Sequence, residues 1–245
     1  MRPRFGDAVG AWMLRPLAEQ LVGELDLRPG AAVCDLLCDG GVLTRELVRA
    51  VAPIGGVVAA DTDLELATDA AVAAGGSCVV VPRMCDGATV PLDDRSCDAV
   101  ASLLTVVFAD HRSLLMDAQR VLRPAGTAAF VVWDPDEPPQ FAAVLERVLR
   151  RHGVASSFLQ KLLTAVAVPQ RARVRVLHDV CRLDTAAHLW GALQDGPLAV
   201  ELAPLSADTV AAVRRDFEAG LAPYMEADGT IRFPLHARLI SLAAA

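Results

Sequence analysis

Short, almost continuously apolar segments alternate in this 245-residue chain with stretches that have helical periodicity. Five of the segments have the length of strands and lie at residues 32–36, 56–61, 78–81, 98–103 and 127–133. Continuous hydrophobicity, rather than alternation between two faces, is typical of strands that are covered on both sides. The alternation of strand and helix therefore predicts an α/β fold with a doubly wound, mostly parallel sheet.

The helices are indicated by apolar residues that recur every three or four positions. These residues include Leu17, Leu21 and Leu25; Leu43, Leu47 and Val51; Leu114, Ala118 and Val121; and Phe141, Leu145 and Val148. Turn sequences such as Arg28-Pro29-Gly30 and Arg123-Pro124-Ala125-Gly126 precede predicted strands. Two further β-rich runs, at 173–183 and 231–242, flank a predicted helix. We therefore expect seven strands with a helical cap or lid.

Charge and composition exclude several kinds of partner. The chain has 23 basic and 30 acidic residues and a net charge of −7, which argues against binding to nucleic acid. The apolar stretch 99–109 ends at Asp110, well short of the roughly 18 residues that a membrane helix needs. The N-terminus lacks an apolar export segment, and the six cysteines mostly lie in apolar segments, so we expect a cytoplasmic protein. Zinc-ligand spacings are absent, and no metal is expected.

Ligands of open α/β sheets bind beyond the carboxyl ends of the strands. The loop after the first predicted strand, residues 35–42, contains Gly40 and Gly41, which allow close approach to a ligand. It lacks the G-x-G-x-x-G pattern of dinucleotide sites, and the chain has no phosphate-binding P-loop. Asp61 ends the second strand, where a carboxylate can bind ribose hydroxyls, and Asp86 follows the third.

Several segments, in this order, resemble the class I (seven-stranded, Rossmann-like) S-adenosylmethionine-dependent methyltransferases, in particular the ubiquinone/menaquinone-biosynthesis-like branch. They are residues 27–35, 55–61, 85–100, 108–111 and 120–126. The resemblance implies a single methyltransferase-like domain over 1–245 and S-adenosylmethionine as cofactor. It divides the chain into N-terminal cap helices (1–30), a cofactor-binding core (31–134), a lid (135–172) and closing strands with a helix (173–245).

The resemblance also implies roles for individual residues. Those expected to bind the cofactor are Asp35, Cys38, Gly40 and Gly41 around the methionine moiety, Asp61 on the ribose, Thr62 beside the adenine, Asp86 on the adenine amino group with Gly87 next to it, and Leu103 with Leu104 close to cofactor and substrate. Two alternatives stay open. Asp35 could cap the first helix, and Asp86 could close an Asx-turn.

The glycine motif of the family is degenerate in this chain. Asp39 occupies a position where the family has glycine, and Leu37 occupies one where glycine is common. A side chain at Asp39 would crowd the methionine moiety if the backbone there needs a positive φ. The segment 102–108 is more apolar than is usual after the fourth strand, which favours an apolar substrate or a redirected site.

His111 is the histidine nearest the expected pocket and the candidate catalytic base, although its position equally suits a residue in the first turn of a helix. Aromatic residues that could line an acceptor cavity, or could belong to the core, are Trp12, Trp133, Trp190, Phe141, Phe158 and Tyr224.

The leading hypothesis is an S-adenosylmethionine-dependent methyltransferase that acts at carbon or oxygen of a small, largely apolar metabolite, in specialised metabolism. One alternative is a methyltransferase-fold enzyme that has lost methyl transfer and catalyses cyclisation or rearrangement. Another is a non-catalytic homologue, because fold does not determine function. A small apolar molecule is the expected partner, and a homodimer is one oligomeric state that the sequence leaves open.

Overall fold

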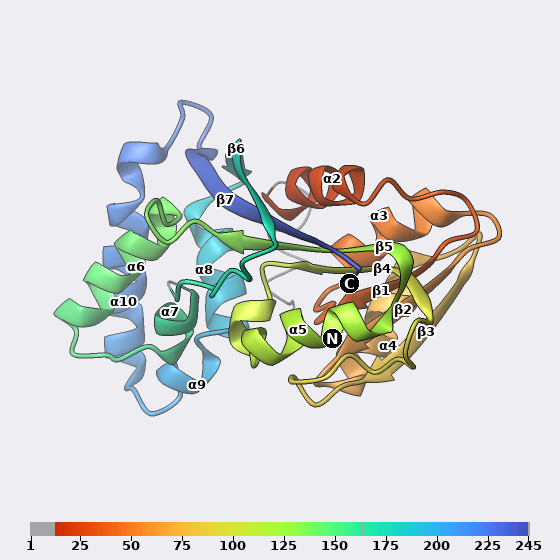
Figure 1. The fold of residues 1–245 in the computed structure, drawn as a ribbon. Helices are drawn as coiled ribbons and strands as arrows, with labels where there is room; N and C mark the ends of the chain where they lie inside the picture. The colour runs from red at the N-terminus through yellow and green to blue at the C-terminus, as the bar shows by residue number, and fades with distance from the viewer. Residues whose placement is uncertain (1–12, 163, 245) are drawn as a thin grey trace.

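The computed structural model describes residues 13–162 and 164–244 and contains a seven-stranded sheet (Figure 1). The strands, in the order β3-β2-β1-β4-β5-β7-β6, are β1 (Ala32–Leu36), β2 (Gly56–Asp61), β3 (Val79–Met84), β4 (Cys97–Leu103), β5 (Leu122–Trp133), β6 (Arg173–Leu183) and β7 (Ile231–Ala243). β1 to β5 pair in parallel, whereas β7 runs antiparallel to both of its neighbours, β5 and β6. The predicted α/β fold with a mostly parallel, doubly wound sheet is confirmed.

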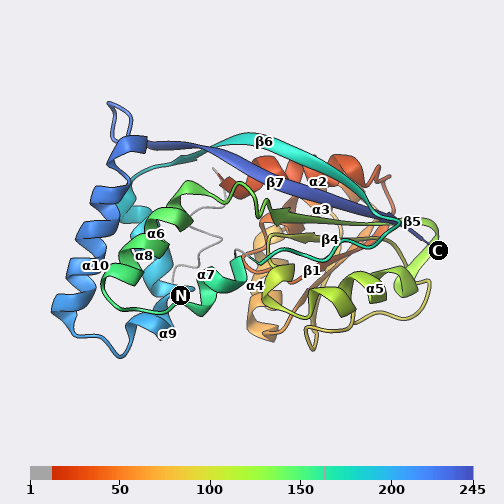
Figure 2. The same cartoon turned by 60° about the vertical axis from the view of Figure 1, so that its left-hand side comes forward.

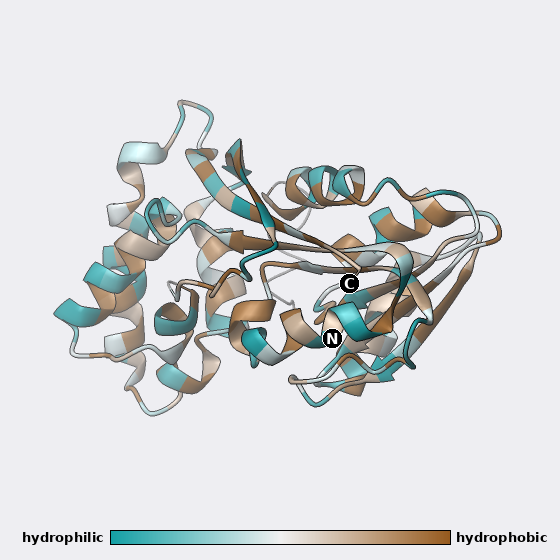
Figure 3. Cartoon of the chain, viewed as in Figure 1, coloured by the Kyte–Doolittle hydropathy of each residue, from teal (hydrophilic) through white to brown (hydrophobic). Residues whose placement is uncertain are grey.

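Helices cover both faces of the parallel part of the sheet. On one face lie α2 (Arg15–Glu24), α3 (Val42–Val51) and α4 (Leu64–Ala74), and on the other lies α5 (His111–Val121). Leu47 of α3 and Leu114 of α5 are completely buried, as the apolar spacing predicts. The central strands are mainly hydrophobic, whereas the helices around them mix hydrophilic and hydrophobic residues (Figure 3).

Two elements differ from the sequence-based expectation. The predicted turn at 123–126 lies inside β5, where the pairing with β4 skips from Leu122 to Thr127 and Ala125 has a φ of 68°. A bulge of this kind keeps a strand continuous while it accommodates turn residues. The helix α4 was not predicted, because its buried residues, Ala67 and Ala70, are small and give no strong apolar period.

Five helices form a cap beyond the carboxyl ends of the parallel strands (Figures 1 and 2). They are α6 (Gln140–Arg151), α7 (Ser157–Leu162), α8 (Ala186–Asp195), α9 (Ala199–Leu202) and α10 (Ala207–Gly220). The first two follow β5, and the other three are inserted between β6 and β7. The buried side chains of the cap, called here the cap core, continue the apolar cluster that packs around α2 and α3. In the cap core Trp190 contacts Phe217, and Phe141 contacts Phe233 of β7.

The long strands β6 and β7 run from the cap back along the sheet, so they connect the two parts of the structure (Figure 2). They pair over eleven residue pairs, from Arg173 with Ser241 to Leu183 with Ile231. Within the described residues, no helix combines the length and the apolar character that a membrane crossing requires.

Candidate active site

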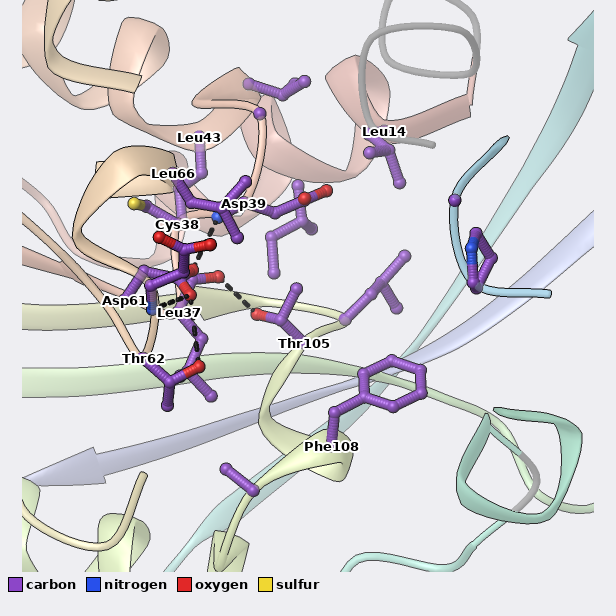
Figure 4. Close-up of a pocket in the computed structure, with 18 of the residues that line it drawn as sticks. Leu14, Leu37, Cys38, Asp39, Leu43, Asp61, Thr62, Leu66, Thr105 and Phe108 are labelled. Atoms are coloured by element: carbon purple, nitrogen blue, oxygen red, sulfur yellow. Dashed lines mark hydrogen bonds between the residues drawn. The ribbon is translucent and has the colours of Figure 1, made fainter. Parts of the chain in front are cut away.

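A cavity of about 820 Å³ lies between the carboxyl ends of β1, β2 and β4 and the cap (Figure 4). This size is within the usual range for small-molecule and cofactor sites. Residues 35–40, 61–63 and 103–105 contribute to its floor, and residues 157–162 and 195–197 contribute from the cap. The cavity is therefore at the sheet edge where ligands of doubly wound folds bind.

Asp61 is buried at the end of β2 and lines the cavity, as the sequence predicts. Its Oδ2 accepts a hydrogen bond from the backbone N–H of Asp39 at 3.1 Å. Its Oδ1 accepts one from the backbone N–H of Asp63 at 3.2 Å and one from the Thr62 hydroxyl at 3.4 Å (Figure 4). These bonds hold the carboxylate in place, and they join the loop after β1 to the loop after β2.

Asp35 is 1% exposed and also borders the cavity. Its Oδ2 accepts a hydrogen bond from Thr44 Oγ1 at 2.5 Å, whereas its Oδ1 has no partner among the described residues. Burial raises the pKa of this carboxyl to about 7; the Thr44 hydrogen bond opposes the rise, and the charges of Asp61 and Asp39 add to it. A buried acceptor without a donor, next to the cavity, suits a ligand that carries a positive charge or an N–H donor.

The loop after β1 has a left-handed backbone at the degenerate positions. Leu37 has a φ of 59° and Asp39 a φ of 42°, in the region that favours glycine. Of the two glycines in the loop, Gly41 has a φ of 73° and does not line the cavity, and a Cβ there would lie 2.8 Å from the Cα of Ala70 in α4. The two departures from the family motif therefore lie where the backbone favours glycine, and they add side chains at the cavity wall.

Replacing Asp39 by glycine is expected to relieve backbone strain. The Asp39→Gly variant should be more stable than Asp39→Ala by about 1 kcal/mol, because both lack the carboxylate and only alanine keeps a Cβ at a positive φ. Urea unfolding of the two variants measures the difference. Equal stability, or a more stable alanine variant, would show that the left-handed backbone at this position costs nothing.

Most of the other predicted cofactor residues lie at the cavity. Cys38, Gly40, Thr62, Leu103 and Leu104 all line it. Gly87 backs the wall, since a Cβ at its φ of 75° would lie 3.4 Å from the Cγ2 of Thr62. Burial raises the pKa of the Cys38 thiol well above its usual value, so this side chain is a neutral part of the wall rather than a thiolate.

The structure does not bring Asp86 into this group. Asp86 is exposed, and its carboxylate accepts hydrogen bonds from the backbone N–H groups of Ala88 and Thr89 at 2.9 and 2.7 Å and from the Thr89 hydroxyl at 3.0 Å. These bonds lower its pKa. Asp86 thus closes a local turn, which was the alternative interpretation, and the expected convergence of three strand-end carboxylates is limited to Asp35 and Asp61.

His111 does not line the cavity either. It is the first residue of α5, directly after Asp110, which caps that helix by accepting a hydrogen bond from the backbone N–H of Ser113 at 3.1 Å. This is the first-turn position that the sequence also allowed. The cavity lining includes no histidine of the described chain, so an imidazole base is not part of this site.

Only part of the aromatic set faces the cavity. Trp133 and Phe158 line it, whereas Trp190 and Phe141 belong to the cap core and Tyr224 packs edge-on against Phe233. Trp12 lies outside the described residues. Phe108 also lines the cavity, although it was not among the aromatic residues predicted to do so. Its ring stacks on that of Phe158 with centroids 5.7 Å apart.

Other lining residues could not have been found from local motifs. Lys161, Asp195 and Pro197 come from two separate parts of the cap. Thr105 Oγ1 donates a hydrogen bond to the carbonyl oxygen of Leu37 at 2.7 Å and lies 3.1 Å from Ser102 Oγ, so it links the loops after β4 and β1. The sequence marks Lys161 only as the single lysine of the chain.

Comparison with known families identifies the core of the fold. Residues 34–130 match the family described as "Methyltransferase domain". The matched segment is about two-fifths of the chain, and in it the chain is similar to the class of methyltransferases that its sequence resembles. The match begins in β1 and ends within β5, so it includes both carboxylates of the cavity floor and excludes the cap. S-adenosylmethionine is the cofactor of this class, and the unpartnered Asp35 oxygen and the Asp61 carboxylate fit a cationic, ribose-containing ligand.

Two curated relatives have named activities. The domain is 33% identical over 136 residues to the nocamycin O-methyltransferase of Saccharothrix syringae, covering 54% of this chain and 48% of that protein. It is 28% identical over 138 residues to the ubiquinone/menaquinone biosynthesis C-methyltransferase of Burkholderia orbicola, covering 53% and 56%. The chain thus spans about half the length of these two relatives.

Solved structures share the fold over nearly the whole chain. A protein of Anabaena variabilis assigned as a methyltransferase of an antibiotic biosynthesis pathway aligns with a TM-score of 0.61 at 16% identity, covering 92% of this chain and 96% of that one. The YcgJ protein of Bacillus subtilis aligns with a TM-score of 0.57 at 14% identity, covering 93% and 98%. At these identities the likeness concerns the fold alone.

Proposed function

We propose that the protein transfers the methyl group of S-adenosylmethionine to carbon or oxygen of a small, largely apolar metabolite. The observation that carries the proposal is the position of Asp35 and Asp61 at the carboxyl ends of β1 and β2, in a cavity that apolar side chains such as Leu103, Leu104 and Trp133 also line. The match to the nocamycin enzyme supports specialised metabolism as its setting. The acidic balance of the chain favours a small molecule over nucleic acid as its partner.

The charge of the cavity suits the cofactor. Among the described residues, six carboxylates line it, those of Asp35, Asp39, Asp61, Asp63, Glu65 and Asp195, against one basic side chain, that of Lys161. A cavity wall with an excess of one sign attracts ligands of the opposite sign. The bound cofactor would supply a methyl group on a positively charged sulfur, which becomes a neutral thioether when the methyl leaves.

The chain contributes position and exclusion of water to the reaction. Asp61 would accept hydrogen bonds from the ribose, and the free oxygen of Asp35 would accept one from the amino group of the methionine moiety. Leu103, Leu104 and Trp133 give the cavity an apolar wall where the acceptor would lie. In-line attack on a methyl group depends mainly on alignment of the two reactants, which these contacts provide.

If methyl transfer requires the acceptor to lose a proton, no histidine of the described cavity lining is there to accept it. The basic groups that line the cavity, among the described residues, are carboxylates and Lys161. An acceptor that loses its proton easily, or that attacks through an electron-rich carbon, fits this set best.

The test is calorimetric titration of the protein with S-adenosylhomocysteine, followed by incubation with labelled S-adenosylmethionine and apolar acceptors. Binding with transfer of label supports the proposal. Absence of heat and of any thermal shift at millimolar ligand contradicts it.

A second function is favoured by one specific observation. Asp39 places a charged side chain at the cavity wall where the family has glycine. A methyltransferase-fold enzyme that instead shapes a reactive substrate for cyclisation or rearrangement would tolerate this change. Binding of the cofactor product without transfer of label to any acceptor would favour that alternative.

A further inference from the structure

We propose that the acceptor of this site carries an anionic group beside its apolar part, and that Lys161 binds that group. The inference rests on the proposed function of the cavity and names the substrate class more closely. A carboxylate, a sulfonate or an ionised enol on a flat apolar skeleton has the required chemistry.

The position of Lys161 is set by an aromatic contact between cap and core. Phe158 of α7 stacks face to face on Phe108, which ends the short 3₁₀-helix η2 (Val106–Phe108), with 3° between the ring planes. Residues three apart on a helix share a face, so Lys161 lies on the same side of α7 as Phe158. Both side chains line the cavity.

This end of the cavity is remote from the expected ribose site. Figure 4 shows Asp61 and Phe108 at opposite sides of the labelled residues, with Thr105 between them. Apolar side chains that line the cavity together with Phe108 include Leu104 and Trp133. An acceptor lying against this wall would reach Lys161 with one end while its other end faces the methyl donor.

No residue in the described part of the chain neutralises the charge of Lys161. Its ammonium group forms no ion pair with a described residue, and the nearest acidic residue of the cap lining, Asp195, is not within ion-pair distance of it. Every other charged side chain of the lining is acidic and would repel an anion. The only part of the described lining that attracts a negative group is therefore the end of α7.

A matched pair of fluorescent probes tests the proposal without the natural acceptor. Anilinonaphthalene sulfonate and N-phenylnaphthylamine have the same aromatic skeleton, and only the first carries an anion. The cofactor-free protein should bind the sulfonate more tightly than the neutral amine. Lys161→Met should weaken sulfonate binding about threefold to fivefold, the upper part of the range for one exposed ion pair, and leave binding of the amine unchanged. Lys161→Arg should keep the preference.

Two further variants make the test specific. Asp195→Asn should tighten sulfonate binding, because it removes the negative charge that the described cap residues contribute to the cavity lining. Arg171→Met is the matched control, since it removes an exposed positive charge that does not line the cavity, and it should have no effect. The sulfonate should also slow acetylation of Lys161, which mass spectrometry can follow because the chain has one lysine.

Three results would overturn the proposal. One is a Lys161→Met variant in which the affinities for the sulfonate and for the neutral amine fall by the same factor. Another is sulfonate binding that leaves the acetylation rate unchanged. The third is a Lys161→Met variant that no longer binds S-adenosylhomocysteine but binds the sulfonate as tightly as wild type does. This result would mean that Lys161 binds the carboxylate of the cofactor. The proposed function itself is contradicted by a different result, which is that the wild-type protein does not bind S-adenosylhomocysteine.

Discussion

The Asp35→Asn variant is expected to lose most of a pH dependence of stability that the wild-type protein shows between about pH 4 and pH 7. The folded-state pKa of Asp35 is about 7 and its ordinary value is 3.8, so the folded protein holds a proton that the unfolded chain has lost. Stability therefore falls as pH rises through this window. The difference corresponds to about 4 kcal/mol, at 1.36 kcal/mol for each pKa unit.

Urea unfolding of wild type and variant, in the absence of ligand, measures this effect. The other titrating groups are common to both proteins, so the stability of the variant relative to wild type should increase from about pH 4 to about pH 7 and then level off. Asparagine keeps an oxygen for the Thr44 hydroxyl and can place its amide nitrogen where the unpartnered Oδ1 of Asp35 lies. A relative stability that does not change with pH would mean that Asp35 is ionised in the folded protein throughout this range.

The Asp61→Ala variant is expected to bind S-adenosylhomocysteine about 10-fold to 150-fold more weakly than wild type. This loss corresponds to about 1.5–3 kcal/mol, the usual contribution of hydrogen bonds to a charged group. The variant also loses the acceptor for the backbone N–H groups of Asp39 and Asp63, so the loop after β1 keeps only its backbone hydrogen bond from Cys38 N–H to the carbonyl oxygen of Ala60 in β2 among these two ties. Isothermal titration calorimetry measures the affinity.

Asp86→Ala is the matched control, because Asp86 follows the neighbouring strand but does not line the cavity. Its affinity should stay within twofold of wild type. Circular dichroism of both variants shows whether they are folded. Unchanged affinity in a folded Asp61→Ala variant would show that Asp61 does not bind the cofactor. A large loss of affinity in Asp86→Ala would show that Asp86 does.

The floor of the site could be predicted because its information is local. Asp35 and Asp61 each end an apolar run, and parallel strands bring their carboxyl ends to one edge. Asp86 also follows a strand, yet the backbone N–H groups of the next residues satisfy its carboxylate. Whether a strand-end carboxylate faces a ligand or closes a turn depends on the loop conformation, which spacing alone does not encode.

The cap could be predicted only in outline. The periodicity around Phe141 and around Val213 indicated helices that the structure contains. The contribution of Lys161 and Asp195 to one cavity depends on how α7 and the end of α8 pack, across a separation of more than 30 residues. Long-range packing of this kind leaves no signal in a local pattern.

The insertion points of the cap have a consequence for how such a protein changes its specificity. The segment shared with the methyltransferase family ends in β5, and all five cap helices come later in the chain. Each cap segment leaves from one strand and returns to another, so its length and sequence can change without interrupting the parallel part of the sheet. Because residues of both insertions line the cavity, such changes would reshape its cap side while Asp35 and Asp61 keep their positions.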